Sequence, residues 1–230
     1  MSRQSLLLIL AQCAIVIGFS HTASLRQEAV QDFRISEQGA ATLEANPVNL
    51  TLYFESLCGA CQEFIVHQVV PTWSKLEASG ILQVHLIPFG NAKETKVGEK
   101  YTFECQHGPD ECQGNIVETC TIHYFPKEKD HIVFIGCFEQ KYDESHDWQA
   151  TLETCAKAAN FSQAKVAEIS QCVSGDLGNT LEHAMAARTG PHQWVPWILL
   201  DGVLNMDAET RLLELVCDAY KGAKPTVCSK

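Results

Sequence analysis

Cys58 and Cys61 are the two residues whose spacing best suits thiol chemistry, as a Cys-x-x-Cys pair enclosing Gly59 and Ala60. A thiol attacks a disulfide only as its thiolate, and a free cysteine with a pKa of about 8.5 is mostly protonated at neutral or acid pH. In the first turn of a helix, backbone N–H groups and the helix dipole would stabilise a Cys58 thiolate. We therefore predict that Cys58 attacks a substrate disulfide and that Cys61, one turn deeper, resolves the mixed disulfide.

Two other uses of this cysteine pair stay open at the level of sequence. A zinc site would need a second pair of ligands at a suitable spacing, which the sequence lacks, so we expect no metal. A permanent structural Cys58–Cys61 bridge would close a very short loop and add little stability. The redox interpretation requires no bound cofactor, only a small thiol as electron donor.

The segments around the pair predict a βαβ unit. Residues 48–54 alternate between strongly apolar and more polar positions, which is typical of a strand. Apolar residues at helical spacing follow the pair up to about residue 76, with Pro71 predicted to kink the helix. A second strand is predicted over residues 81–88, so the pair would lie at the carboxyl end of the first of two parallel strands.

The rest of the chain predicts an insertion and a return to the sheet. Residues 91–187 are rich in charge and cysteine, with helices predicted at 148–159 and 162–172. Strand-like order resumes at residues 195–200, an Asp-Gly turn follows, and an amphipathic helix is predicted at 208–220.

The Val195-Pro196 step matches the thioredoxin layout, in which a cis-proline faces the redox pair, so both residues are predicted to bind substrate. An ordinary edge-strand proline is the alternative, because a sequence does not reveal the isomer. We predict an α/β thioredoxin-like fold with a large cysteine-rich, mainly helical insertion between the second strand and the cis-proline strand.

The first 46 residues predict targeting and processing segments. Residues 1–20 combine Arg3 with an apolar run and small residues, as in a signal peptide, although a retained N-terminal anchor is the alternative. Residues 21–46 are interpreted as a leader or propeptide, and residues 47–230 as the thioredoxin-like domain that carries the redox pair. The run is shorter than the ~20 residues that span a bilayer, so we expect no membrane insertion. The formal net charge of −11 argues against nucleic acid as a partner.

Cysteine and sequon patterns agree with an oxidising compartment. Of the eleven cysteines, Cys13 lies in the predicted signal peptide, and eight others accompany the redox pair. The simplest interpretation is that these eight cysteines form four structural disulfides, and we predict that Cys217 pairs with Cys228. The triplets at Asn49 and Asn160 are N-glycosylation sequons, of which Asn160 is the better candidate because Asn49 opens a predicted strand.

A second motif indicates the family. Residues 105–120 read CQHGPDECQGNIVETC, which matches the signature C-Q-H-G-x2-E-C-x2-N-x4-C. The chain thus resembles the gamma-interferon-inducible lysosomal thiol reductase family over residues 48–228. The resemblance implies a lysosomal or late endosomal enzyme that reduces protein disulfides at acid pH and unfolds endocytosed antigens. It places Cys58 and Cys61 at the active site and implies glycosylation and the mannose-6-phosphate receptor as a partner. The predicted signal peptide adds secretion as a second expected destination.

Within the signature, His107 invites an auxiliary role, since an imidazolium near Cys58 would favour the thiolate. Local hydrogen bonding is the more ordinary interpretation of this histidine. Two other functions compete with the reductase: a disulfide oxidase or isomerase of the secretory pathway, and a non-catalytic disulfide-rich binding glycoprotein. The first differs in the redox potential of the pair, and the second predicts an unreactive, permanently oxidised pair.

Overall fold

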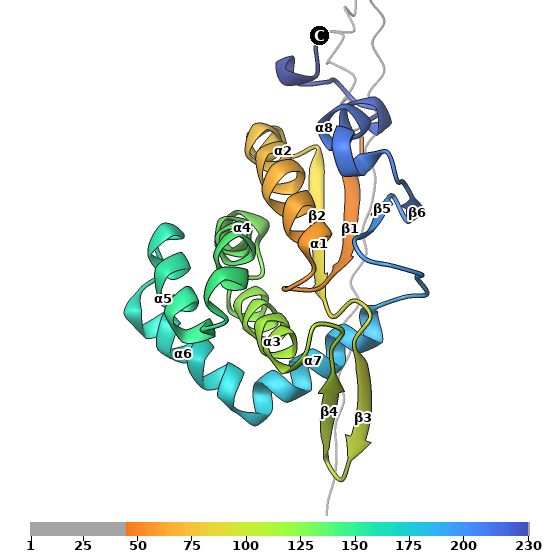
Figure 1. The fold of residues 1–230 in the computed structure, drawn as a ribbon. Helices are drawn as coiled ribbons and strands as arrows, with labels where there is room; N and C mark the ends of the chain where they lie inside the picture. The colour runs from red at the N-terminus through yellow and green to blue at the C-terminus, as the bar shows by residue number, and fades with distance from the viewer. Residues whose placement is uncertain (1–44, 230) are drawn as a thin grey trace, which may run out of the picture. The chain divides into compact units, whose positions relative to one another are not determined.

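A four-stranded sheet organises residues 45–229, the part of the chain described in the computed structural model (Figure 1). The strand order is β2-β1-β5-β6, with β1 parallel to β2 and antiparallel to β5. The four strands are β1 (Val48–Phe54), β2 (Leu82–Pro88), β5 (Trp197–Leu200) and β6 (Val203–Leu204). The predicted signal peptide and nearly all of the predicted leader lie outside the described residues.

Strand β1 forms where the apolar alternation predicted it. Val48, Leu50, Leu52 and Phe54 are all buried, and they pair in parallel register with β2 from Val48 opposite Leu82 onward. Burial of large apolar side chains in neighbouring strands supplies most of the stabilisation of such a sheet. The predicted βαβ unit is confirmed.

The helix between β1 and β2 has a π-helical turn at its centre. It runs as α1 (Gly59–Phe64), the π-helical segment η1 (Ile65–Val69) and α2 (Val70–Leu76), and a short 3₁₀ turn (Glu77–Ser79) ends it. Pro71 lies just beyond η1 and has no N–H to donate to the preceding turn. The interruption predicted at Pro71 therefore takes the form of a widened turn upstream of the proline.

A hairpin and five helices stand between β2 and β5 (Figure 1). The helices predicted at 148–159 and 162–172 are confirmed as α5 and α6, whereas the hairpin β3–β4 was not predicted. The elements are β3 (Lys93–Val97), β4 (Lys100–Glu104), α3 (Pro109–Tyr124), α4 (Glu128–Ser145), α5 (Trp148–Ala158), α6 (Gln163–Ser174) and α7 (Asp176–Arg188). The chain thus has the thioredoxin-like fold with a cysteine-rich, mainly helical insertion.

The return to the sheet begins two residues later than predicted. The Val195–Pro196 peptide bond is cis, and β5 starts only at Trp197, because Pro196 has no N–H for the ladder. Asp201 and Gly202 make the predicted turn, and α8 (Ala208–Ala219) confirms the predicted C-terminal helix. A final 3₁₀ turn, Thr226–Cys228, brings Cys228 back to Cys217.

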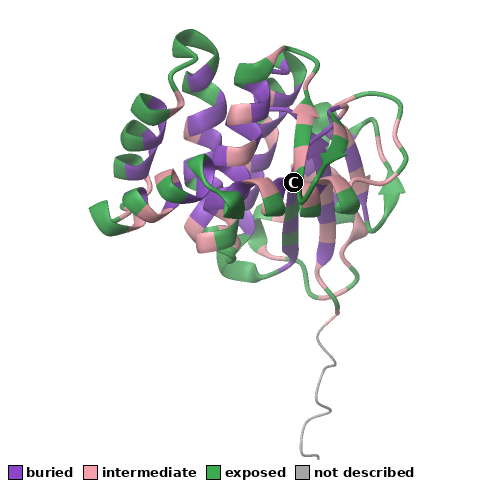
Figure 2. Cartoon of the chain, turned by 90° about the horizontal axis from the view of Figure 1, so that it is seen from below, coloured by how far each residue is buried: buried purple, intermediate pink, exposed green. Residues whose placement is uncertain are grey.

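Four disulfides cross-link the described residues, and Cys58 and Cys61 are free thiols. The predicted Cys217–Cys228 bridge is confirmed, and the remaining bridges are Cys105–Cys112, Cys120–Cys172 and Cys137–Cys155. Figure 2 shows buried positions on the inward sides of both the helices and the strands, so the insertion and the sheet unit share a core. Within residues 45–229, no helix has the length and apolar character needed to cross a bilayer.

Candidate active site

Cys58 and Cys61 lie where β1 gives way to α1, and their sulfur atoms are 2.7 Å apart. Cys58 is the N-cap of α1, so its sulfur accepts a hydrogen bond from the backbone N–H of Cys61 at 3.4 Å. The Cys61 side chain is fully buried, whereas Cys58 keeps 8% of its surface exposed. An incoming substrate sulfur can therefore reach Cys58 first.

The surroundings drive the pKa values of the two thiols apart. The hydrogen bond from the Cys61 thiol lowers the pKa of Cys58 to about 7 against the opposing effect of burial, with help from backbone N–H groups and the charge of His107. Burial, followed by the hydrogen bond that Cys61 donates to Cys58, raises the pKa of Cys61 far above its usual range. The pair thus combines an ionisable outer sulfur with a protonated inner one.

The cis-proline loop lies beside the outer sulfur. The carbonyl oxygen of Val195 is 3.9 Å from Cys58 Sγ, and Pro196 lines a groove of about 450 Å³ together with Ala60 and Phe64. Charged and polar side chains line the rest of the groove: Glu63, His67, Gln68, Glu209 and Thr210. The structure thus places the Val195 carbonyl beside Cys58 Sγ, and Pro196 and Ala60, close to these two residues in the chain, line an open groove.

The signature motif contacts the loop that precedes Cys58. Ser56 donates its backbone N–H to Asn115 Oδ1 at 2.9 Å and its hydroxyl to the Glu111 carbonyl at 3.0 Å. A Cβ atom on Gly114 would lie 2.3 Å from Ser56 Oγ, so only glycine allows this approach. Three signature positions, Glu111, Gly114 and Asn115, therefore fix the position of the redox loop, although Gly114 is one of the variable positions of the motif.

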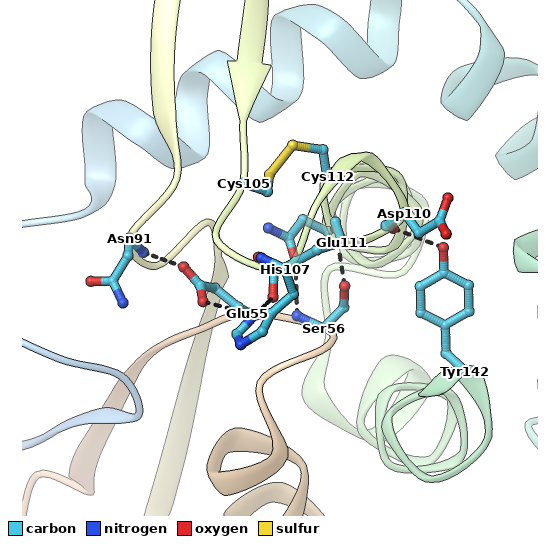
Figure 3. The surroundings of a disulfide bond; sticks show 10 residues. Glu55, Ser56, Asn91, Cys105, His107, Asp110, Glu111, Cys112 and Tyr142 are labelled. Carbon is cyan, nitrogen blue, oxygen red and sulfur yellow. Dashed lines mark hydrogen bonds and ion pairs between the residues drawn. A yellow bond between two sulfur atoms is a disulfide. The ribbon is translucent and has the colours of Figure 1, made fainter. Parts of the chain in front are cut away.

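His107 lies in a cluster with two buried carboxyl groups, those of Glu55 and Glu111 (Figure 3). Its Nδ1 contacts Glu111 Oε2 and lies 3.8 Å from Glu55 Oε2, while 42% of the His107 side chain is exposed. Two backbone groups orient the carboxyls: Asn91 N–H donates to Glu55 Oε1 at 2.6 Å, and His107 N–H donates to Glu111 Oε1 at 2.9 Å. The Cys105–Cys112 disulfide closes the loop that carries His107.

The charges of this cluster shift its pKa values upward. Burial, reinforced by the neighbouring Glu111, raises the pKa of Glu55 to about 7. Partial burial lowers the pKa of His107, but the hydrogen bond and charge of Glu111 outweigh it and the net shift is upward. One ligand atom from each of the three residues lies within 4.8 Å of the others, so this donor set could also hold a metal ion.

Sequence reasoning found His107 but assigned no role to Glu55 or Glu111. Both were visible as signals: Glu55 is a lone charge between an apolar strand and the Cys-x-x-Cys pair, and Glu111 is a fixed position of the signature. Sequence rules place glutamate at the surface, yet both side chains are completely buried.

The two sequons occupy different environments. Asn160 is exposed at the turn between α5 and α6, in a left-handed backbone conformation. Asn49 lies within β1, and its side chain contacts Pro47, His85 and Asp201. Asn160 is thus the more accessible acceptor.

The family profile described as gamma interferon inducible lysosomal thiol reductase matches residues 49–183. A protein from Carassius auratus named gamma-interferon-inducible lysosomal thiol reductase is 39% identical over 194 residues, covering 81% of this chain and 74% of its own. The mouse protein of the same name is 37% identical over 188 residues, covering 80% and 72%.

Among solved structures, oxidised BdbD from Bacillus subtilis is similar with a TM-score of 0.56 at 11% identity, over 76% of this chain and 89% of that one. At this identity the likeness concerns the fold alone. The family match, by contrast, spans the redox pair and the signature motif. The chain therefore belongs to the gamma-interferon-inducible lysosomal thiol reductase family and is a thiol-disulfide oxidoreductase.

Proposed function

We propose that this chain reduces disulfide bonds of endocytosed proteins at acid pH, in lysosomes or late endosomes, and so aids antigen unfolding. The observation that carries the proposal is the asymmetry of the pair: the buried Cys61 thiol donates to Cys58 Sγ at 2.7 Å. A nucleophile of low pKa beside a protonated partner is the arrangement that thiol-disulfide exchange requires. The reductase names of the relatives support the reductive direction.

The reaction begins with the Cys58 thiolate. It attacks one sulfur of a substrate disulfide, the substrate S–S bond breaks, and the other substrate sulfur leaves as a thiolate that takes up a proton. Cys61 then loses its proton and attacks Cys58 Sγ, which releases the second substrate thiol and leaves Cys58 and Cys61 joined. Two equivalents of a small thiol reduce this disulfide and complete the cycle.

Val195 and Pro196 hold the substrate in this scheme. The groove along Ala60, Phe64 and Pro196 is open, and the Val195 carbonyl lies beside the attacking sulfur. A segment in extended conformation would align one of its sulfurs with Cys58 there, and that alignment is the main contribution of the loop to the rate. His107 acts as an auxiliary group through its charge.

Delivery to the lysosome follows from the predicted signal peptide and a glycan. The exposed Asn160 is the acceptor that we expect to carry the glycan recognised by the mannose-6-phosphate receptor, with Asn49 as the secondary site. A fraction that misses the receptor would be secreted. Treatment with a glycosidase that removes N-linked glycans, applied to wild type and Asn160→Gln, tests which sequon is used.

The test of the reaction uses protein purified from cells that express the full chain. Reduction of a disulfide-bonded protein by a small thiol is followed at pH 4.5 and pH 7.4, for wild type, Cys58→Ser and Cys61→Ser. We expect turnover at pH 4.5 that is lost in Cys58→Ser, and a mixed disulfide with substrate that accumulates in Cys61→Ser.

Two outcomes would contradict the proposal. Net formation of disulfides in a reduced substrate, with no reduction at either pH, would show an oxidase or isomerase. A Cys58 that resists alkylation after mild reduction would instead favour the third function, a non-catalytic disulfide-rich binding glycoprotein.

A further inference from the structure

The cis-proline loop, residues 190–196, leads into β5 without regular secondary structure. The proposed function needs this loop beside the Cys58 sulfur, and the inference below rests on that function. Apart from the contact between Val195 and Cys58, a single side-chain hydrogen bond joins the loop to another segment among residues 45–229. It links His192 Nε2 to Asn91 Oδ1 at 3.1 Å.

Asn91, in the turn after β2, makes hydrogen bonds to three different segments. Its backbone N–H donates to Glu55 Oε1 at 2.6 Å, and its side chain points away from that contact (Figure 3). There its Nδ2 donates to Gln106 Oε1 in the signature motif at 2.7 Å, while its Oδ1 contacts His192. One residue thus joins the end of β1, the signature motif and the cis-proline loop.

The turn that carries Asn91 is itself held against β1. The Phe89 N–H donates to the Phe54 carbonyl at 3.0 Å. Gly90 has a φ of +55°, and a Cβ atom there would lie 2.5 Å from Glu55 Cγ, so this close packing requires glycine. The backbone of Asn91 is therefore fixed relative to the end of β1, directly before the redox pair.

His192 is oriented by its neighbours so that it faces Asn91. Its ring packs edge-on against Tyr53 of β1 and Trp197 of β5, with ring centroids 5.7 Å and 6.3 Å away. Its Nδ1 lies 2.9 Å from the Gly190 carbonyl oxygen within the loop. These contacts leave Nε2 directed at Asn91, so the bond between the two side chains sets where the loop lies.

The space between the cis-proline loop and the signature motif is open. Asn91, Gln106 and Gln193 line a groove of about 370 Å³ there. An open groove supplies no packing contacts that would hold the two segments at a fixed separation. The side-chain amide of Asn91, which contacts both segments, supplies that constraint instead.

We propose that Asn91 is a positioning residue for protein substrates: it holds the cis-proline loop at the separation from Cys58 that a bound polypeptide requires. A protein substrate must align one sulfur with Cys58 while its backbone lies along Val195 and Pro196, so a displaced loop slows the attack. A small disulfide reaches Cys58 without an extended segment and uses few of these contacts. Asn91 thus favours disulfides of polypeptides over small ones.

The experiment follows the two half-reactions separately in full-length purified protein. Reduced enzyme is mixed at pH 4.5 with an excess of a disulfide-bonded protein or of uncharged hydroxyethyl disulfide, and the loss of the two enzyme thiols is timed. Oxidised enzyme is mixed with the small thiol, and the return of the thiols is timed. The first two rates report attack on a large and on a small disulfide, and the third reports reduction of the redox pair.

Two variants break the link at different ends. Asn91→Ala keeps the backbone N–H and removes the side-chain amide. His192→Phe keeps an aromatic ring at the same place and removes the hydrogen bond. Asn179→Ala is the matched control, because Asn179 is also half-buried and makes two side-chain hydrogen bonds, both to the backbone of Tyr101.

We expect Asn91→Ala and His192→Phe each to slow attack on the protein disulfide by about three- to tenfold, the range that one hydrogen bond supplies. The rates with hydroxyethyl disulfide and with the small thiol should stay within about twofold of wild type, a split that a general structural defect would not produce. The double variant should be no slower than the slower single variant, because both changes break the same link. Asn179→Ala should match wild type in all three rates.

Equal slowing of all three rates in the two variants would overturn the inference, because it would indicate a general structural role. Wild-type rates with the protein disulfide in both variants would also overturn it and leave the reductase intact. Circular dichroism checks folding, and His192→Phe alone decides if Asn91→Ala does not fold. A wild type that fails to react with the protein disulfide would instead be a failure of the proposed function.

Discussion

The sheet unit and the helical insertion are stabilised in different ways. The sheet unit, residues 48–88 and 197–228, buries mainly apolar side chains and has one disulfide. The insertion, residues 93–188, contains three disulfides and four completely or almost completely buried glutamates, Glu111, Glu118, Glu139 and Glu182. A polar interior contributes less hydrophobic stabilisation, so disulfides provide a larger share of the folding free energy in the insertion.

The redox site lies where these two regions meet. Cys58, Cys61 and Glu55 come from the sheet unit, while His107 and Glu111 come from the insertion. The sheet unit thus provides the reacting sulfurs and one buried carboxyl group, and the insertion provides the imidazole and the second buried carboxyl group beside them. Three substitution experiments can break or sharpen this division.

The largest expected effect comes from opening the longest disulfide loop of the insertion. Replacing both Cys120 and Cys172 by serine removes a cross-link spanning 52 residues, which the chain-entropy relation values at about 4 kcal/mol. The matched change in the sheet unit, Cys217→Ser with Cys228→Ser, opens 11 residues and should cost about 3 kcal/mol. Urea unfolding measures both losses in the free energy of unfolding.

The comparison would fail if opening the sheet-unit bridge cost as much as opening the insertion bridge. The insertion would then gain no more from its cross-links than the apolar sheet unit does.

A second effect is acid stabilisation that originates in the insertion. Glu118 on α3 and Glu139 on α4 are completely buried, and none of their four oxygens has a hydrogen-bond partner outside the pair. Burial raises the pKa of Glu118 to about 8 and that of Glu139 well above 4.5. Below about pH 4.5 both carboxyls are protonated in the folded and in the unfolded chain. Burying them then carries no cost for an ionised group. As pH rises toward 8, unfolding releases protons and stability falls.

Unfolding followed by calorimetry from pH 5 to pH 8 checks this sign. Each proton released contributes a slope of up to about 1.4 kcal/mol per pH unit. Replacing Glu118 and Glu139 by glutamine should make the slope shallower, with Glu55 and Glu182, whose pKa values burial also raises, providing the remainder. The same change at the exposed Glu144 and Glu153 should leave the slope unchanged. His131, whose pKa burial lowers, acts in the opposite direction below pH about 6.5. A wild-type stability that rises between pH 5 and pH 8 would contradict the prediction.

Local sequence patterns predicted the sheet unit well. Alternation in 48–54, helical spacing after Cys61 and the Asp-Gly turn are short-range signals, and each element formed close to its predicted bounds. The bridge between Cys217 and Cys228 was predictable because few residues separate them. The six cysteines of the insertion allow 15 connectivities, and only the packed structure selects one.

The insertion was harder to predict because its polar residues do not follow surface rules. The hairpin of 93–97 and 100–104 has few apolar residues, so it gives almost no strand signal. Helix α3 begins with Pro109, a start signal that could have been used, but its buried Glu111 and Glu118 break the apolar pattern. The link between the signature and the redox loop depends on contacts across 55 or more residues, which no local pattern contains.

The contact of Ser56 with the signature helix joins the two regions directly. A substitution at this contact is expected to have the smallest effect of the three. In Gly114→Ala, the added Cβ would lie 2.3 Å from Ser56 Oγ and 2.6 Å from the Tyr142 ring, so the redox loop or α3 must move. Overpacking of this kind costs about 1–3 kcal/mol. We expect the free energy of unfolding to fall by that amount and reductase activity to fall severalfold, because Ser56 precedes Cys58 by only two residues.

Removing the opposing side chain provides the control for this last prediction. Ser56→Gly alone loses the hydrogen bond to the Glu111 carbonyl, but combined with Gly114→Ala it relieves the contact at Oγ. The two changes should therefore be less damaging together than the sum of their separate effects, and a double-mutant cycle measures this coupling. Strictly additive losses would mean that the signature helix and the redox loop do not constrain one another, and that the insertion affects Cys58 through its charges alone.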